Sequence, residues 1–179
     1  MIMASGDKNL RTTPPTPETG ARLTLRQDGA PITILLVDDD PDCRMLLRDA
    51  IAECKVSNSV YEVANGAEAL KFLRRQGEYA DAPRPGLIYL DIEMPGMNGQ
   101  EALQAIKSDP ALHEIPVVMM TGVSDEDQMQ TAMSNGANSY TIKPANAEQF
   151  LRTVLASTNY WLTIHQYPEH HLPAEACRR

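Results

Sequence analysis

The chain has 179 residues, and its 16 Lys and Arg against 24 Asp and Glu give a formal net charge of -8. This acidic balance argues against the clustered basic surface that binds nucleic acid, so we expect no nucleic-acid partner. No apolar run approaches the roughly 18 residues of a membrane span, and no signal-peptide block opens the chain. We therefore expect a cytoplasmic protein with no membrane segment.

The two ends of the chain lack the patterns of packed elements. Residues 1–30 are rich in Pro, Gly, Thr and charged residues without periodicity, which predicts a flexible leader, with Leu23 and Leu25 as a candidate short strand. Residues 166–179 are short and mixed, which predicts a C-terminal tail. Residues 31–165 between them have the length of one ordinary domain.

From residue 32 the chain alternates between short apolar runs and helical patterns. The expected strands are 32–37, 59–63, 87–90, 115–120 and 139–142. The expected helices start at Asp40-Pro41, Asn65, Asn98, Ser124 and Asn146, and Gly77, Pro110 and Gly136 end three of them. This alternation predicts an α/β fold, a doubly wound, parallel, five-stranded (βα)5 sheet with helices on both faces.

The three cysteines show no metal-like spacing. Cys43 and Cys54 fall in or at the end of the first helical pattern, and Cys177 lies in the tail. We expect reduced thiols here, with no disulfide.

Polar residues follow four of the predicted strands. They are Asp38-Asp39, Asp91, Thr121-Gly122 and Lys143-Pro144. Because the carboxyl ends of parallel strands meet at one edge of the sheet, these side chains should converge. Each has an ordinary explanation by itself, as a helix cap, a turn cap or a solvated lysine. Together they indicate a site.

The chemistry of this set points to phosphoryl groups. Three carboxylates at neighbouring strand ends repel one another unless a cation lies among them, and oxygen-only ligands suit Mg²⁺. Lys143 and Thr121 offer a positive charge and a hydroxyl to phosphoryl oxygens. Asp91 is then a candidate nucleophile that accepts a phosphoryl group as an acyl phosphate.

Over about residues 31–160, these motifs and Leu-Asp91-x-x-Met-Pro-Gly-x-x-Gly resemble the receiver domain of bacterial two-component response regulators. The resemblance implies the receiver (flavodoxin-like) fold with Asp91 as phosphoacceptor. It implies Mg²⁺ ligands from Asp38, Asp39, Asp91 and the backbone carbonyl of Glu93, and phosphoryl contacts from Lys143, Thr121 and Gly122. Thr121 and Tyr140 are the implied switch pair, which repacks the surface of the fourth helix, fifth strand and fifth helix.

The resemblance also implies partners. A sensor histidine kinase would phosphorylate this single-domain response regulator, which is no enzyme beyond slow self-dephosphorylation. The 15 to 20 residues after the last helix are too few for an output domain, so output should pass to a downstream protein or a phosphorelay partner.

The loop 77–86 and the stretch 160–163 resemble stand-alone receivers that partner phytochrome-type histidine kinases, whose extended last helix often supports a homodimer. Trp161 has two alternatives, a dimer contact or packing on the flank of the sheet.

Two other interpretations stay open. One is a pseudo-receiver, a scaffold that binds partners without phosphorylation. The other is a haloacid-dehalogenase-type phosphatase, whose Asp-x-Asp motif Asp38-Asp39-Asp40 mimics, although Pro41 stands where a small Gly is expected. A local hypothesis adds that Glu93 and Val123, each two residues beyond a site residue, flank the path of the water that hydrolyses the phosphoryl group.

Overall fold

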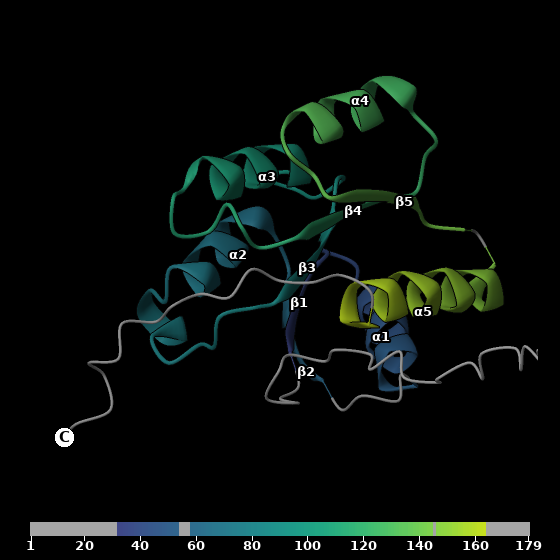
Figure 1. The fold of residues 1–179 in the computed structure, drawn as a ribbon, viewed down its shortest axis with the longest axis horizontal. Helices are drawn as coiled ribbons and strands as arrows, with labels where there is room; N and C mark the ends of the chain where they lie inside the picture. The colour runs from purple at the N-terminus through teal and green to yellow at the C-terminus, as the bar shows by residue number, and fades with distance from the viewer. Residues whose placement is uncertain (1–31, 54–57, 145, 164–179) are drawn as a thin grey trace, which may run out of the picture.

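The computed structural model describes residues 32–53, 58–144 and 146–163, in which a parallel sheet lies between two layers of helices (Figure 1). The strands are β1 (Thr33–Val37), β2 (Ser59–Val63), β3 (Leu87–Asp91), β4 (Val117–Thr121) and β5 (Ser139–Ile142). The helices are α1 (Pro41–Ala52), α2 (Gly66–Leu73), α3 (Gly99–Ser108), α4 (Glu126–Ser134) and α5 (Ala147–Thr163), with a short 3₁₀ helix η1 (Gly77–Tyr79). The predicted (βα)5 fold is confirmed.

The strand order β2-β1-β3-β4-β5 positions the site. All four neighbouring pairs are parallel. The chain moves outward from β1 to β2 and then returns past β1 to β3, so the direction of winding reverses between β1 and β3. In such sheets a crevice forms beyond the carboxyl ends of the strands at this reversal. Asp38 follows β1 and Asp91 ends β3, so both lie at that crevice.

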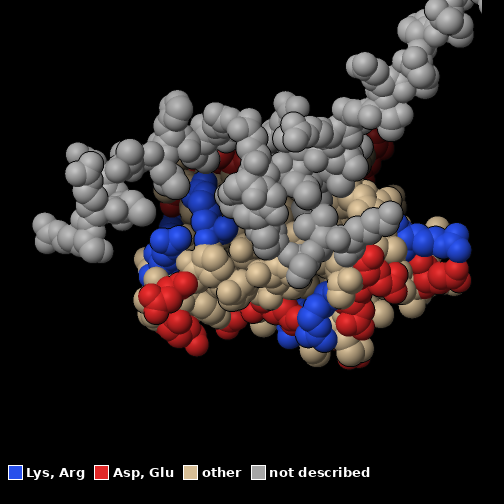
Figure 2. Space-filling view, turned by 60° about the horizontal axis from the view of Figure 1, so that its bottom comes forward, with Lys and Arg blue, Asp and Glu red and all other residues tan. Residues whose placement is uncertain are grey.

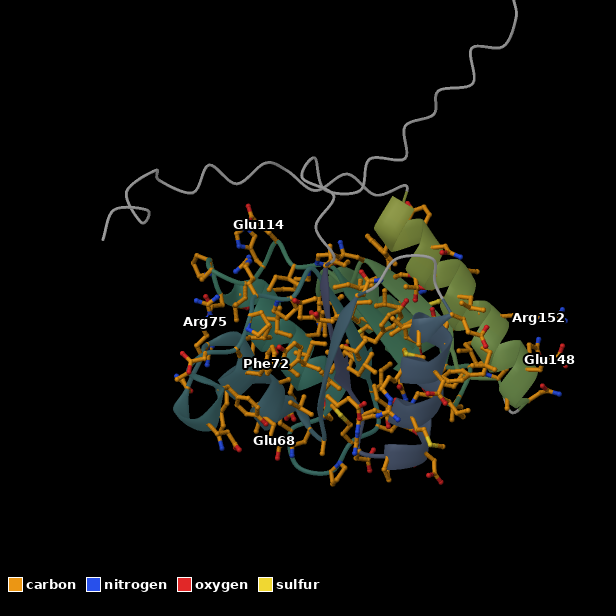
Figure 3. All side chains as sticks on the ribbon, turned by 90° about the horizontal axis from the view of Figure 1, so that it is seen from below. Glu68, Phe72, Arg75, Glu114, Glu148 and Arg152 are labelled. Atoms are coloured by element: carbon orange, nitrogen blue, oxygen red, sulfur yellow. The ribbon has the colours of Figure 1, made fainter. Side chains whose placement is uncertain are left out.

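Two hydrophobic cores share the central strands because successive side chains of a strand point to opposite faces. Leu35, Val37 and Leu90 pack toward α2 and α3. Leu36 and Tyr89 pack toward α1 and α5. Viewed from below, Phe72 lies on the α2 side of the sheet, while Glu148 and Arg152 project from the outer surface of α5 on the other side (Figure 3).

Several element boundaries differ from the predictions. Strand β1 starts at residue 33 instead of 32, and β4 spans 117–121 instead of 115–120. Helix α2 ends at Leu73, before Gly77, because Arg75 adopts the left-handed conformation with φ 54° and breaks the helix first. Gly77 instead opens η1 inside the expected loop, and the ring of Tyr79 returns to Phe72 with a centroid distance of 5.4 Å.

Helix α4 starts one residue later than predicted. Asp125, not Ser124, is its N-cap, since the Asp125 carboxylate accepts from the backbone N–H groups of Asp127 at 3.0 Å and Gln128 at 3.1 Å. The negative charge of this carboxylate also interacts favourably with the positive end of the helix dipole.

Several predictions concern residues outside the described ranges. They are the leader, the candidate strand at Leu23 and Leu25, the tail, Cys54 and Cys177. Cys43 is described, and it is a free, half-buried thiol that packs against the α1/α5 core.

One face of the described residues carries mixed charge. On the face in Figure 2, Lys and Arg side chains alternate with Asp and Glu. Among the helices that the described residues form, none combines the length and hydropathy needed to cross a bilayer.

Candidate functional site

The three consecutive aspartates after β1 divide into different roles. Asp38 turns inward and is 1% exposed, and its Oδ1 accepts from the backbone N–H of Asp40 at 2.9 Å. Asp39 is exposed. Asp40 caps α1 as predicted, accepting from the N–H of Asp42 at 2.9 Å. This local hydrogen bonding ends the strand, starts the helix and leaves two carboxylates for chemistry.

The loop after β3 holds the backbone of Asp91 tightly. The N–H of Gly99 donates to the carbonyl of Ile92 at 3.0 Å. A Cβ on Gly99 would lie 2.0 Å from the carbonyl oxygen of Asp91, so only glycine allows α3 to begin this close. Gly96 makes the preceding turn with φ +79°. The Asp91 carboxylate therefore stands on a rigid support, 6% exposed.

The carboxylates of Asp38, Asp39 and Asp91 form one cluster, with ligand oxygens all within 4.8 Å of one another. Two of these residues are buried and Asp39 is exposed, so the cluster opens to solvent on one side. Hard oxygen donors that would otherwise repel one another suit a divalent cation such as Mg²⁺ or Mn²⁺. Glu93, the fourth predicted ligand through its backbone, is an exposed residue in the same loop.

Lys143 joins this cluster from the end of β5. Its Nζ donates to Asp38 Oδ2 at 2.6 Å and lies 3.0 Å from Asp91 Oδ1, although only the first contact has hydrogen-bond geometry. Burial alone would lower the pKa of Lys143, but the hydrogen bond and charge of Asp38, with the charge of Asp91, raise it overall. These carboxylates therefore favour the charged ammonium form of Lys143.

Burial raises the pKa of Asp91, and the charge of Asp38 adds to this effect, while Lys143 opposes it. A carboxylate kept from water and only partly compensated binds an incoming cation or electrophile more readily than a solvated one. The Asp91 Oδ1 atom makes no well-formed hydrogen bond within the described residues, although the Lys143 ammonium lies 3.0 Å from it.

Thr121 and Gly122 follow β4 at the same edge. Thr121 is fully buried, and its hydroxyl accepts from the N–H of Val123 at 3.2 Å. In this structure Thr121 thus caps its own turn, one of the ordinary explanations above. A Cβ on Gly122 would meet nothing within 4 Å, so the space beside it is open.

Tyr140 lies beside Thr121. Its ring is half-buried against the α2/α3/α4 core, and its hydroxyl is shielded from solvent without a well-formed hydrogen bond to any described residue. Burial raises the pKa of Tyr140, the Thr121 hydroxyl lowers it, and Asp125 and Glu93 raise it further. The structure therefore brings the two predicted switch residues together.

Trp161 is packed within its own chain. It is 5% exposed, belongs to the α1/α5 core and meets the neighbouring Tyr160 edge-on at a centroid distance of 5.3 Å. Of the two alternatives, the structure supports packing on the flank of the sheet. Tyr160, 48% exposed, is the aromatic surface residue of this stretch. The side chain of Val123, which the local hypothesis places beside the path of the hydrolytic water, is 52% exposed.

Sequence reasoning missed two residues of the site. The Arg44 guanidinium donates to the backbone carbonyl of Asp38. Burial, a hydrogen bond to Asp38 and the charge of Asp38 raise the pKa of Cys43 to about 12, while Lys143 opposes the shift. Their position in the first turn of α1, directly after the Asp cluster, was the available signal.

Comparisons with known proteins agree with this geometry. Residues 34–155 match the family model described as the response regulator receiver domain. Response regulator Rcp1 of Synechocystis sp. is 32% identical over 136 residues, which cover 76% of this chain and 92% of Rcp1.

Two solved structures have the same fold. The phosphorylated cyanobacterial phytochrome response regulator RcpA is 38% identical with a TM-score of 0.75, covering 78% of this chain and 100% of RcpA. The Mn²⁺-bound form of Rcp1 is 32% identical with a TM-score of 0.74, again covering 78% of this chain and 100% of that structure.

Proposed function

Because this chain belongs to the response regulator receiver domain family, we propose that it is a response regulator phosphorylated on Asp91. The observation that carries the proposal is the environment of the Asp91 carboxylate, which lies buried within 4.8 Å of two other carboxylates and 3.0 Å from Lys143. The donor is the phosphohistidine of a sensor histidine kinase.

In the transfer, a carboxylate oxygen of Asp91 attacks phosphorus while the phosphorus–nitrogen bond of the phosphohistidine breaks, so no redox partner is required. Lys143 neutralises phosphoryl oxygens, since its ammonium already lies between Asp38 and Asp91. The open space beside Gly122 leaves room for the group. Apart from transfer and slow self-dephosphorylation, we propose no enzymatic activity.

The acidic cluster would hold Mg²⁺. Asp38, Asp39 and Asp91 offer the carboxylate ligands and Glu93 a backbone carbonyl, and the ion would neutralise the charge that develops on the transferring group. Support comes from the oxygen-only donor set and from the Mn²⁺-bound form of the relative Rcp1.

Signal output uses the Thr121 and Tyr140 pair. The Thr121 hydroxyl, which now accepts from the N–H of Val123, would move to donate to a phosphoryl oxygen, and Tyr140 would repack against the vacated side. The face formed by α4, β5 and α5 would change with them, and a downstream protein or phosphorelay partner would bind it.

The kinase is of the phytochrome type, by analogy with RcpA and Rcp1. We also propose a leader over 1–30, a receiver over 31–165, a tail over 166–179, a cytoplasmic location and a homodimer. Exposed Tyr160, rather than buried Trp161, would lie in the dimer contact.

Intact-mass analysis after incubation with acetyl phosphate tests the proposal. We expect one phosphoryl adduct that requires Mg²⁺ and disappears in Asp91→Asn. Asp49→Asn, an exposed change on α1 outside the cluster, is the matched control and should leave the adduct intact.

Two other outcomes separate the alternatives. A folded wild type that forms no adduct would instead support the pseudo-receiver scaffold. Steady phosphate release from phosphomonoesters that survives Asp91→Asn and is lost in Asp38→Asn would support the phosphatase.

A further inference from the structure

Helix α4 is held to the domain by little apolar packing. Ala132 is its only buried residue among those described, and Met129 and Met133 are 39% and 48% exposed. Figure 1 shows α4 beside α3 at the outer side of β4 and β5. A helix anchored by one small side chain depends strongly on any polar contact that it makes.

Such a contact comes from α3. The side-chain amide of Gln100 donates from Nε2 to the backbone carbonyl of Gln128, in the first turn of α4, at 3.0 Å. Gln100 directly follows Gly99, whose N–H donates to the carbonyl of Ile92, the residue after Asp91, at 3.0 Å. A short covalent and hydrogen-bonded path therefore runs from the backbone of Asp91 to α4, separate from Thr121 and Tyr140.

The same interface contains uncompensated polar atoms. The Oε1 atoms of Gln100 and Gln128 are both buried, and no described group donates a hydrogen bond to either. Separation of α4 from α3 would break the Gln100 hydrogen bond but would let water reach both oxygens. The gain would offset part of the loss, so this hydrogen bond adds only a limited free energy to the attachment of α4.

We propose that Gln100 is a positioning residue that tethers the first turn of α4 to α3 in the unphosphorylated protein and so opposes the displacement of α4 on activation. The effect on activation rests on the proposed phosphorylation of Asp91, whereas the tether itself does not. Removal of the tether should loosen α4 in the free protein and favour the phosphorylated arrangement.

Amide hydrogen exchange on the full chain tests the tether without phosphate. In Gln100→Ala, exchange over 126–134 should be about two- to tenfold faster than in wild type, the range that one neutral hydrogen bond supports, with α2 and β3 unchanged. Gln104→Ala is the matched control, because Gln104 is an exposed glutamine one turn later on α3, and it should exchange as wild type. Equal exchange of α4 in wild type and Gln100→Ala would overturn the proposal.

A second variant guards against general loosening of the fold. Gln100→Glu keeps the size of the side chain but presents an oxygen to the Gln128 carbonyl, so it should accelerate α4 exchange alone. If both variants lose protection throughout the domain, Gln100 is a general stability residue and the tether is refuted.

Titration with beryllofluoride and Mg²⁺ tests the consequence for activation. Half-saturation should occur at a two- to tenfold lower concentration in Gln100→Ala than in wild type, because less free energy opposes the active arrangement. Unchanged half-saturation would refute the effect on activation. Failure of wild type itself to bind beryllofluoride would refute the proposed function, while the exchange experiment would still decide the tether.

Discussion

The two ends of the sheet each hold a partly buried lysine, and the surroundings shift the pKa values of the two lysines in opposite directions. Lys143, at the carboxyl end, contacts carboxylates at 2.6 and 3.0 Å, and these anions raise its pKa despite burial. Lys107, near the amino ends of β4 and β5, donates to three neutral oxygens, and burial lowers its pKa to about 8.

This contrast in the surroundings of the two lysines supports the proposed site at the carboxyl end of the sheet. At the carboxyl end, fixed positive charge and crowded negative charge leave an electrostatic imbalance that a cation and a phosphoryl group would relieve. At the amino end, the Lys107 ammonium bonds the carbonyls of His113 and Ile115 and the side-chain oxygen of Asn138, at 2.8 to 3.0 Å. These contacts join segments that precede β4 and β5, so Lys107 serves the fold.

The same substitution at both lysines should separate the two roles most strongly. Lys143→Met leaves two buried carboxylates without their cation, so we expect a loss of roughly 3 kcal/mol in the free energy of unfolding at pH 7 and at least about a tenfold drop in acetyl phosphate labelling. The loss should shrink as pH falls, because burial raises the pKa of Asp91 and a protonated Asp91 no longer needs the Lys143 cation. Urea unfolding and intact mass measure the two effects.

Lys107→Met is the control for that experiment and should keep labelling within about twofold of wild type, because Lys107 contacts no carboxylate at the site. Equal labelling in the two methionine variants would contradict the assignment of Lys143 to the phosphorylation site and of Lys107 to the fold.

A smaller effect is expected when Asp91 loses its charge. Burial raises the pKa of Asp91 above the ordinary 3.8. Between 3.8 and the raised value, the folded state binds more protons than the unfolded state, so the free energy of unfolding falls as pH rises through this range. Asp91→Asn removes this cost, and we expect the metal-free protein to gain on the order of 1 kcal/mol at pH 7, as measured by urea unfolding in EDTA.

Mg²⁺ should reduce the stability advantage that Asp91→Asn has over wild type in the absence of metal. The ion should stabilise wild type more than Asp91→Asn, since the variant lacks one carboxylate ligand. A variant that is less stable than wild type without metal, or equally stabilised by Mg²⁺, would contradict the electrostatic account of the carboxyl end.

The smallest effect is the contribution of Lys107 to the pH dependence of stability. Its pKa is about 8 in the folded protein against the ordinary 10.5 of an unburied lysine, so between these values the unfolded chain binds more protons. Wild type should therefore gain stability relative to Lys107→Met as pH rises from about 8 to 10, by about 1 kcal/mol or less for this partly exposed group. A constant difference across that range would show that the three hydrogen bonds preserve the charge.

Most of the fold was predictable because its signals are local. Apolar runs of strand length, the caps Asp40, Asn65 and Asn98, and the alternation of patterns are readable from neighbouring residues. The two errors in helix boundaries arose where residues compete over one or two positions, with Arg75 ending α2 before Gly77 and Asp125 capping α4 in place of Ser124.

The residues that form the candidate site were predictable from the sequence, but the contacts around them were less so. Strand ends in a parallel sheet converge by topology, so Asp38, Asp91 and Lys143 were expected to meet, and they do. The roles of Arg44 and Cys43 beside Asp38 depend on how α1 leaves the strand, which composition does not reveal.

The sequence by itself determined the α/β architecture and the residue types at the strand ends, because period, caps and topology follow from local chemistry. Only the tertiary structure decided which aromatic of the last helix is buried, which lysine is paired with anions and how α4 is attached to α3. These depend on distances between residues far apart in the chain, such as the 28 residues from Gln100 to Gln128 and the 105 from Asp38 to Lys143. Packing of whole elements sets those distances, and it combines many weak contacts that no single stretch of sequence contains.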